Sequence, residues 1–252
     1  MSAGREQALV WAALAATATV AWRAALLRAE EMAAMPTCHG TMGLGPGAFL
    51  AMWSAMMSAM MLPAVAPVAV LWAGAIRRQA RPAVRATRLG LFIGGYLVVW
   101  SGLGAVAYLV ADAVEALLRR RPAAAAPLAA SIFAVAGIWQ WSPWKAACLR
   151  HCRSPLGHLA RYTGWRGPLR DLRIGAHHGL ICAACCWALM GLLLAVGLMN
   201  VPAMLAIAAF VCAERWPRIG PAATHLAGAL LLVLAALAPF TPALRAGLDA
   251  GY

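Results

Sequence analysis

The sequence predicts an all-α protein, a bundle of about seven transmembrane helices forming one integral membrane domain over residues 1–252. Of the 252 residues, 63% are hydrophobic and 12% are charged, and the mean hydropathy is +0.75. Ordinary globular domains contain about 45–50% apolar residues. Apolar segments close to the roughly 20 residues of a membrane-spanning helix recur along the chain. Basic residues are concentrated in alternate connections, which is typical of polytopic membrane proteins.

The first expected span is followed by a loop rich in sulfur. Residues 8–27 lack the basic start and the small-residue cleavage site of a signal peptide, so we expect a retained helix. The next loop reads AEEMAAMPTCHGTMG and holds Cys38 and His39 among several methionines. Thiolate, thioether and imidazole donors suit Cu(I), so Cys38 and His39 are candidate ligands. Alternatively, the methionines of the loop only cap a helix end.

The second expected span, residues 44–76, contains a stripe of methionines. It is longer than a simple span and includes Pro63 and Pro67, which predict a kinked helix. Within the segment MWSAMMSAMMLP, methionines recur every four residues on one face. Candidate ligands that would line an approach at membrane depth are Met56, Met60 and Met61. The same stripe also suits adaptable packing, and the sequence leaves both interpretations open.

Glycines and aromatic residues mark the next two spans. The segment 89–110 contains Tyr96 and several glycines, which indicates close contact with a neighbouring helix. The segment 123–141 ends in an aromatic cluster that includes Trp139 and Trp141. Tryptophans gather where a helix leaves the membrane, so this cluster is expected at the interface.

The fifth expected span, residues 174–199, carries most of the cysteines. It includes the segment HHGLICAACCWALMGLLLAVGLMN. At about 100° per residue, the side chains at four positions fall within one sector about 100° wide. These four are His178, Cys182, Cys185 and Cys186. Imidazole and thiolate groups on one face of a membrane helix indicate soft-metal or redox chemistry. The alternative is a run of small buried residues, because free cysteine packs like a small hydrophobe.

A second cysteine pair lies in the long polar connection before that span. Cys148 and Cys152 are four residues apart, so on a helix they would share a face. We expect them to form a second, cytoplasm-facing site just below the first. We also expect Met61 to lie near the first site, because both are about fifteen residues from the cytoplasmic ends of their helices.

The last two expected spans, 201–213 and 221–240, complete a topology with a cytoplasmic N-terminus. Arginines crowd the connection after the second span and the connection 145–173, and the more basic side of a membrane protein is cytoplasmic. The net charge of +13 is therefore a topology signal, and no nucleic-acid partner is expected. Cysteines on the reducing cytoplasmic side are expected to be thiols.

Several segments form recognisable motifs. They are MWSAMMSAMMLP, Tyr96-x-x-x-Trp100, AGIWQWSPWKAACLRHCRSP, HHGLICAACCWALM and Glu214-Arg215. Together they resemble the bacterial predicted metal-binding integral membrane proteins, a domain-of-unknown-function family. The resemblance covers residues 45–220 and implies metal binding in a bacterial inner membrane, with no established reaction. Ala183 and Ala184 stand where the family often has a bulkier residue or glycine, and Arg215 where lysine is usual. Neither departure removes a candidate ligand.

These patterns favour an inner-membrane protein that binds a soft transition metal for transport, delivery or sensing. Copper is the favoured metal, and zinc is the other metal that such donors suit. Expected partners are the lipid bilayer, the metal ion and a metal-handling protein of the membrane or periplasm. One alternative is a membrane thiol–disulfide oxidoreductase, and another is a non-catalytic scaffold or accessory subunit. No nucleotide-binding loop or hydrolase triad is present, so an ATP-driven pump is disfavoured and enzyme activity is not expected.

Overall fold

The fold was analysed in a computed structural model that describes residues 3–33, 40–77, 81–154, 157, 161–162 and 164–249. All regular elements in these ranges are helices, which confirms the all-α class. The α-helices are α1 (Ala3–Ala33), α2 (Pro46–Ile76), α3 (Pro82–Arg120), α4 (Ala125–Gln140), α5 (Pro143–Arg153), α7 (Arg170–Val196), α8 (Val201–Glu214) and α9 (Gly220–Leu237). Two short 3-10 helices are η1 (Pro122–Ala124) and η2 (Pro242–Arg245).

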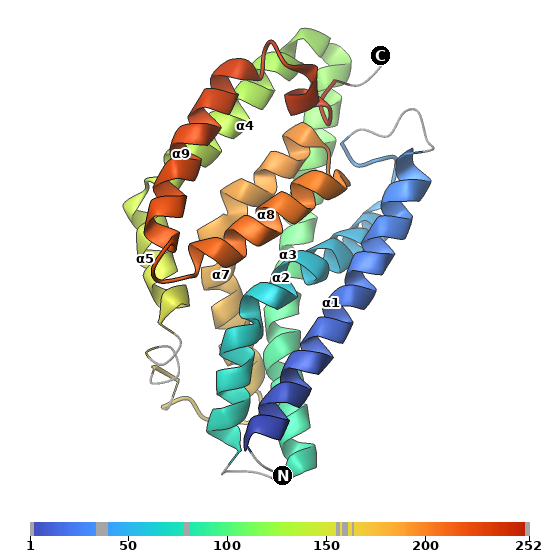
Figure 1. The fold of residues 1–252 in the computed structure, drawn as a ribbon. Coiled ribbons are helices and arrows are strands. Elements are labelled where there is room, and N and C mark those ends of the chain that lie inside the picture. Colours follow the sequence, from blue (N-terminus) through green and yellow to red (C-terminus); the bar gives the residue numbers. More distant parts are fainter. Residues whose placement is uncertain are drawn as a thin grey trace.

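The long helices run up and down through the bundle, with α5 continuing in the direction of α4, and α1 begins at the lower end in Figure 1 whereas α9 ends at the upper end. The main packed pairs are α3 with α7, α1 with α2, α4 with α9, and α2 with α3. In the most apolar stretch of each helix, 67% of α2 and 61% of α7 is buried, against 17–28% of the other long helices. The core therefore forms around α2 and α7.

Six helices are long and apolar enough to cross a membrane: α1, α2, α3, α4 together with η1, α7 and α9. They correspond to six of the expected spans. The expected sixth span coincides with α8, which has only 14 residues. At about 1.5 Å per residue such a helix is about 21 Å long, shorter than the roughly 30 Å hydrocarbon layer. That segment is therefore a shorter apolar helix, and the prediction of a seventh span is not supported there.

Local sequence explains where the helices begin and bend. Proline stands at the first or second position of several helices, where its missing N–H costs nothing. Ser142 caps α5 by accepting from the Trp144 amide at 3.2 Å, and Asn200 caps α8 through the Ala203 amide at 3.0 Å. Pro63 and Pro67 lie inside α2, and α2 bends along its length, as expected for internal prolines (Figure 1).

Two glycines bring the backbones of α3 and α7 into contact. A side chain at Gly95 would overlap the carbonyl oxygen of Leu172, and one at Gly175 would overlap that of Phe92. The expected close packing of the third span is thus present at Gly95, whereas nothing lies within 4 Å of an added Cβ at Gly94. This contact places Tyr96 of α3 against the cysteine-bearing face of α7.

Candidate metal centre

The three cysteines of α7 lie in the core. Cys182, Cys185 and Cys186 are exposed by 0%, 2% and 1%. The expectation that they point inward together is met, because a lipid-facing cysteine would be exposed on the surface of the bundle. The Sγ of Cys186 donates to the carbonyl oxygen of Cys182 at 3.0 Å, and the Trp139 indole donates to the Cys185 carbonyl at 3.4 Å.

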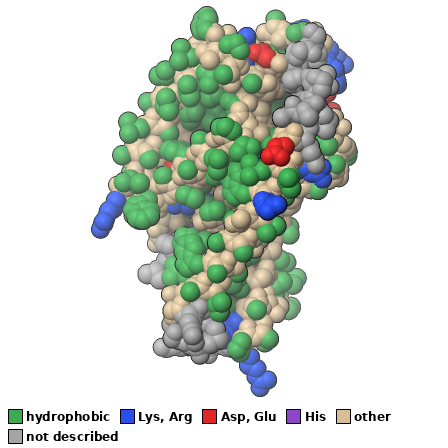
Figure 2. Space-filling view, turned by 45° about the vertical axis from the view of Figure 1, so that its right-hand side comes forward, with side chains coloured by type: hydrophobic (Ala, Val, Ile, Leu, Met, Phe, Trp, Pro, Cys, Tyr) green, Lys and Arg blue, Asp and Glu red, His purple; other side chains and the backbone are tan. Residues whose placement is uncertain are grey.

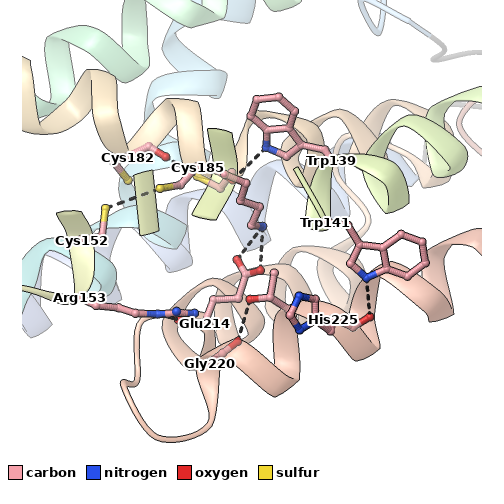
Figure 3. A network of polar contacts seen from close by, with 12 residues as sticks. Trp139, Trp141, Cys152, Arg153, Cys182, Cys185, Glu214, Gly220 and His225 are labelled. Atoms are coloured by element: carbon pink, nitrogen blue, oxygen red, sulfur yellow. Dashed lines mark hydrogen bonds and ion pairs between the residues drawn. The ribbon is translucent and has the colours of Figure 1, made fainter. Parts of the chain in front are cut away.

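A second helix brings its cysteines to the same place. α5 packs against α7, and the Sγ of Cys152 lies 3.7 Å from the Sγ of Cys185 (Figure 3). A hydrogen bond with Cys185 lowers the pKa of the Cys148 thiol to about 7 and also lowers the pKa of Cys152. Cys152 is buried, whereas Cys148 is partly exposed. The sequence analysis expected Cys148 and Cys152 to form a second site just below the first, whereas the structure brings Cys152 into direct contact with Cys185 of the α7 cluster.

Cys182 is surrounded by polar groups that suit a thiolate. The Nη2 of Arg215 donates to the Cys182 sulfur at 2.8 Å, and Nη1 of the same guanidinium donates to the carbonyl oxygen of Ala64. The Tyr96 hydroxyl lies 3.2 Å from that sulfur and 3.3 Å from the carbonyl oxygen of Met61. Met61 therefore lies beside the cluster, as expected from its distance along its helix.

Beside the thiols is a buried ion pair. Lys145 and Glu214 are 0% and 1% exposed, and the Lys145 Nζ lies 2.7 Å and 3.0 Å from the two carboxylate oxygens of Glu214. Arg153 also donates to the backbone oxygen of Glu214 at 2.8 Å (Figure 3). A buried pair of this kind neutralises itself, because one cation faces one anion. It also ties α5 to the end of α8, which carries Arg215.

Arg215 has no such carboxylate partner in the part of the chain that the structure describes. Its contacts are the Ala64 carbonyl and the Cys182 sulfur, and it also interacts electrostatically with Cys152. A half-buried cation is stabilised by a neighbouring negative charge. An anion at Cys182, either the thiolate itself or a thiolate–metal complex, would supply that charge.

The other candidate ligands occupy the surrounding core. His178 is 1% exposed, and its ring stacks on Phe92 and Tyr96 with centroid distances of 6.2 Å and 5.9 Å. The methionines of α2 that the sequence singles out are fully buried: Met56, Met60 and Met61. Cys38 and His39 lie outside the described residues.

The thiols are arranged as a pair rather than as a complete metal cage. Within the described ranges, no three His, Cys, Asp or Glu side chains are grouped closely enough to enclose a metal ion. The Cys152–Cys185 separation of 3.7 Å nevertheless fits a two-thiolate clip. This separation is close to that of two thiolates on one tetrahedral Zn(II), where each sulfur is about 2.3 Å from the metal and the sulfurs are about 3.8 Å apart.

Sequence reasoning missed the polar groups that serve these thiols. It treated Tyr96 and Arg215 only as members of motifs, and it assigned no role to Lys145. The available signal was a charged residue at the end of an apolar helix, because ionisable groups at membrane depth are usually functional.

Comparison with known proteins adds the identity of the family. Neither the curated proteins nor the solved structures include a match to this chain. The PpoB2 family, described as copper chaperone, matches residues 50–238. That range runs from α2 to α9 and includes all the thiols described above. The chain belongs to the PpoB2 copper chaperone family.

Proposed function

We propose that this protein is an integral membrane copper chaperone that carries Cu(I) on thiolates of α5 and α7. The observation that carries the proposal is the 3.7 Å approach of Cys152 to Cys185 from two different helices. Soft thiolate ligands select Cu(I), and the family description names copper. The ion is cargo here, because a chaperone receives and releases it.

Integration into a membrane is supported by the outer surface of the bundle. Large apolar side chains are exposed along several helices, including Val98 at 65%, Leu109 at 66% and Leu226 at 71%. The face in Figure 2 is largely hydrophobic, with few charged side chains. A soluble protein rarely exposes so large an apolar area. We propose a single inner-membrane domain with its N-terminus in the cytoplasm.

Charge balance favours a monovalent ion. Two thiolates and one Cu(I) together carry one negative charge, which the guanidinium of Arg215 balances. Two thiolates and Zn(II) are neutral and would leave the half-buried Arg215 without a neighbouring anion. Arg215 thus acts as the counter-ion of a copper–dithiolate complex.

The ion would move by exchange of sulfur ligands. Cys148 is the partly exposed member of the group and suits the first encounter with the cytoplasmic side. Cys152 and Cys185 would then clip the ion, and Cys182 and Cys186 would receive it deeper in the core. His178 and the methionines Met56, Met60 and Met61 are proposed as deeper ligands. Cys38 and His39, in the sulfur-rich loop after the first expected span, are proposed as a separate site that captures copper outside the cell membrane's cytoplasmic face.

The same thiol pair also favours a second function. Two free thiols 3.7 Å apart can form a disulfide after a small movement, as a thiol–disulfide oxidoreductase requires. The two functions differ in what they need. A chaperone needs both thiols reduced and binds metal, whereas an oxidoreductase cycles between thiol and disulfide with a partner.

A metal titration tests the proposal. The detergent-solubilised, reduced protein is titrated anaerobically with Cu(I) against a chromogenic chelator. We expect high-affinity copper binding by the wild type, loss in the Cys152→Ser/Cys185→Ser variant, and near wild-type binding in Cys212→Ser. Full copper binding by the double variant would refute the proposed site. A wild type that binds no copper but forms a Cys152–Cys185 disulfide in the cell would favour the oxidoreductase.

Labelling of introduced cysteines tests the topology. A cysteine-free variant is given one cysteine at Arg85, at His158 or at Arg120, and whole cells are treated with an impermeant maleimide. We expect labelling at position 120 only, because Arg85 in the first turn of α3 and position 158 belong to the basic segments that we propose to be cytoplasmic. Labelling at position 158 in intact cells would contradict the proposed orientation.

A further inference from the structure

A basic pocket lies between α3 and α7, at the opposite end of α7 from α8. It has a volume of about 620 Å³. Its polar lining is formed by Thr87, Arg88, Arg166, Arg170 and Asp171. None of these residues belongs to the thiol cluster, and the copper site does not use them. The pocket therefore needs an explanation of its own.

The pocket has more positive than negative charge. Arg88 and Asp171 neutralise each other through two hydrogen bonds of 2.9 Å and 3.2 Å. Arg166 and Arg170 supply two further cations to the lining. Within the described residues, no carboxylate contact accompanies these two arginines. An anion of up to two negative charges would complete the balance.

Arg170 is held in place for such an anion. Its guanidinium lies over the Trp72 ring at 5.5 Å, which fixes the plane of the group. Its Nε is shielded from solvent and donates to no acceptor in the described part of the chain. A shielded donor without an acceptor is costly, and a bound oxyanion would remove that cost. Arginine presents its donors in a fork that matches phosphate.

The position of the pocket indicates the source of the phosphate. It lies where the apolar helices α3 and α7 begin, at Pro82 and Arg170. Val84, which is 49% exposed, and Leu91 add apolar side chains to the lining. In a membrane protein this level corresponds to the lipid headgroups, and basic pockets between helices on the cytoplasmic side bind anionic headgroups.

We propose that this pocket binds the phosphate of an anionic phospholipid, with Arg166 and Arg170 as its main ligands. The proposal rests on the membrane integration proposed above, and it is independent of the copper site. The shared chemistry is a phosphate group, and the test distinguishes a lipid from free inorganic phosphate.

Native mass spectrometry of protein released from nanodiscs tests the proposal. The nanodiscs contain phosphatidylglycerol and phosphatidylcholine in equal amounts. We expect the wild type to retain phosphatidylglycerol preferentially, and the Arg166→Gln/Arg170→Gln variant to bind it at least about tenfold more weakly. Arg120→Gln/Arg121→Gln removes the same charge at the other end of α3 and should retain the lipid. Equal retention of both lipids by the wild type, or unchanged retention by the pocket variant, would overturn the proposal.

Two further arms keep the result interpretable. The single Arg166→Gln change alters an exposed side chain with little effect on folding, and it should give an intermediate loss of lipid. Displacement of the lipid by an equimolar amount of inorganic phosphate would overturn the lipid assignment in favour of a soluble anion. Copper titration of the same samples separates the two proposals. Loss of lipid from the Arg166→Gln/Arg170→Gln variant with intact copper binding supports the lipid pocket. Preferential lipid retention by a wild type that binds no copper contradicts only the copper function.

Discussion

The guanidinium of Arg215 donates a 2.8 Å hydrogen bond to the sulfur of Cys182 in the interior of the bundle. Arginine stays protonated in proteins, so this contact places a permanent positive charge beside a thiol. The neighbouring cation Lys145 is already neutralised by Glu214. Arg215 is therefore the charge that a copper–dithiolate complex would balance.

Removing that charge should change the choice of metal. In Arg215→Met, the affinity for Cu(I) relative to Zn(II) should fall by at least about tenfold, because a charge-assisted contact is lost only from the anionic copper complex. Arg215→Lys keeps the charge and should retain most of the preference. Both affinities are measured by chelator competition, with Ag(I) as a second monovalent ion. An equal loss for Cu(I) and Zn(II) in Arg215→Met would mean that Arg215 only supports the fold.

The Lys145–Glu214 pair should matter for stability rather than for metal choice. Lys145→Met leaves a carboxylate buried without its cation and should destabilise the protein by about 3–5 kcal/mol. Lys145→Met/Glu214→Leu removes both charges and should recover most of that loss. Arg119→Gln, which breaks the exposed pair with Glu115, should cost less than about 1 kcal/mol. Unfolding of the solubilised variants in denaturing detergent measures all three. A double variant as unstable as the single one would contradict this account.

The contact between α3 and α7 gives a further prediction. Gly175→Ala would force a methyl group into the backbone of Phe92, so we expect the free energy of unfolding to fall by about 1–3 kcal/mol. Copper affinity should fall with it, because the same contact positions Tyr96 against Cys182. Gly191→Ala on the same helix meets nothing within 4 Å and should be tolerated. Thermal unfolding and copper titration compare the two, and wild-type behaviour of Gly175→Ala would show that the helices can separate without effect.

The helical class and the shared face of the α7 cysteines follow from local information. Hydropathy and the 100° periodicity of a helix place Cys182, Cys185 and Cys186 together without knowledge of the other helices. The spacing of Cys148 and Cys152 likewise requires only one turn of helix. These features could therefore be predicted from the sequence.

The groups that serve the thiols depend on packing between distant segments. Arg215 reaches Cys182 only because α8 turns back across the bundle, and Lys145 meets Glu214 across 69 residues of sequence. Neither contact has a periodic signal in the sequence. The bounds of α8 agree with the expected segment 201–213, but its 14 residues are too few to cross the hydrocarbon layer, so its apolar composition alone made it resemble a span.

X-ray absorption at the copper edge tests the central claim most directly. The Cu(I)-loaded wild type should show a first shell of sulfur, supplied by Cys152 and Cys185 with Arg215 nearby as counter-ion. The Cys152→Ser/Cys185→Ser variant, loaded under the same conditions, should lose that sulfur shell, whereas Cys212→Ser should keep it. A wild-type shell made only of nitrogen and oxygen, or an unchanged sulfur shell in the double variant, would contradict a thiolate copper site between α5 and α7.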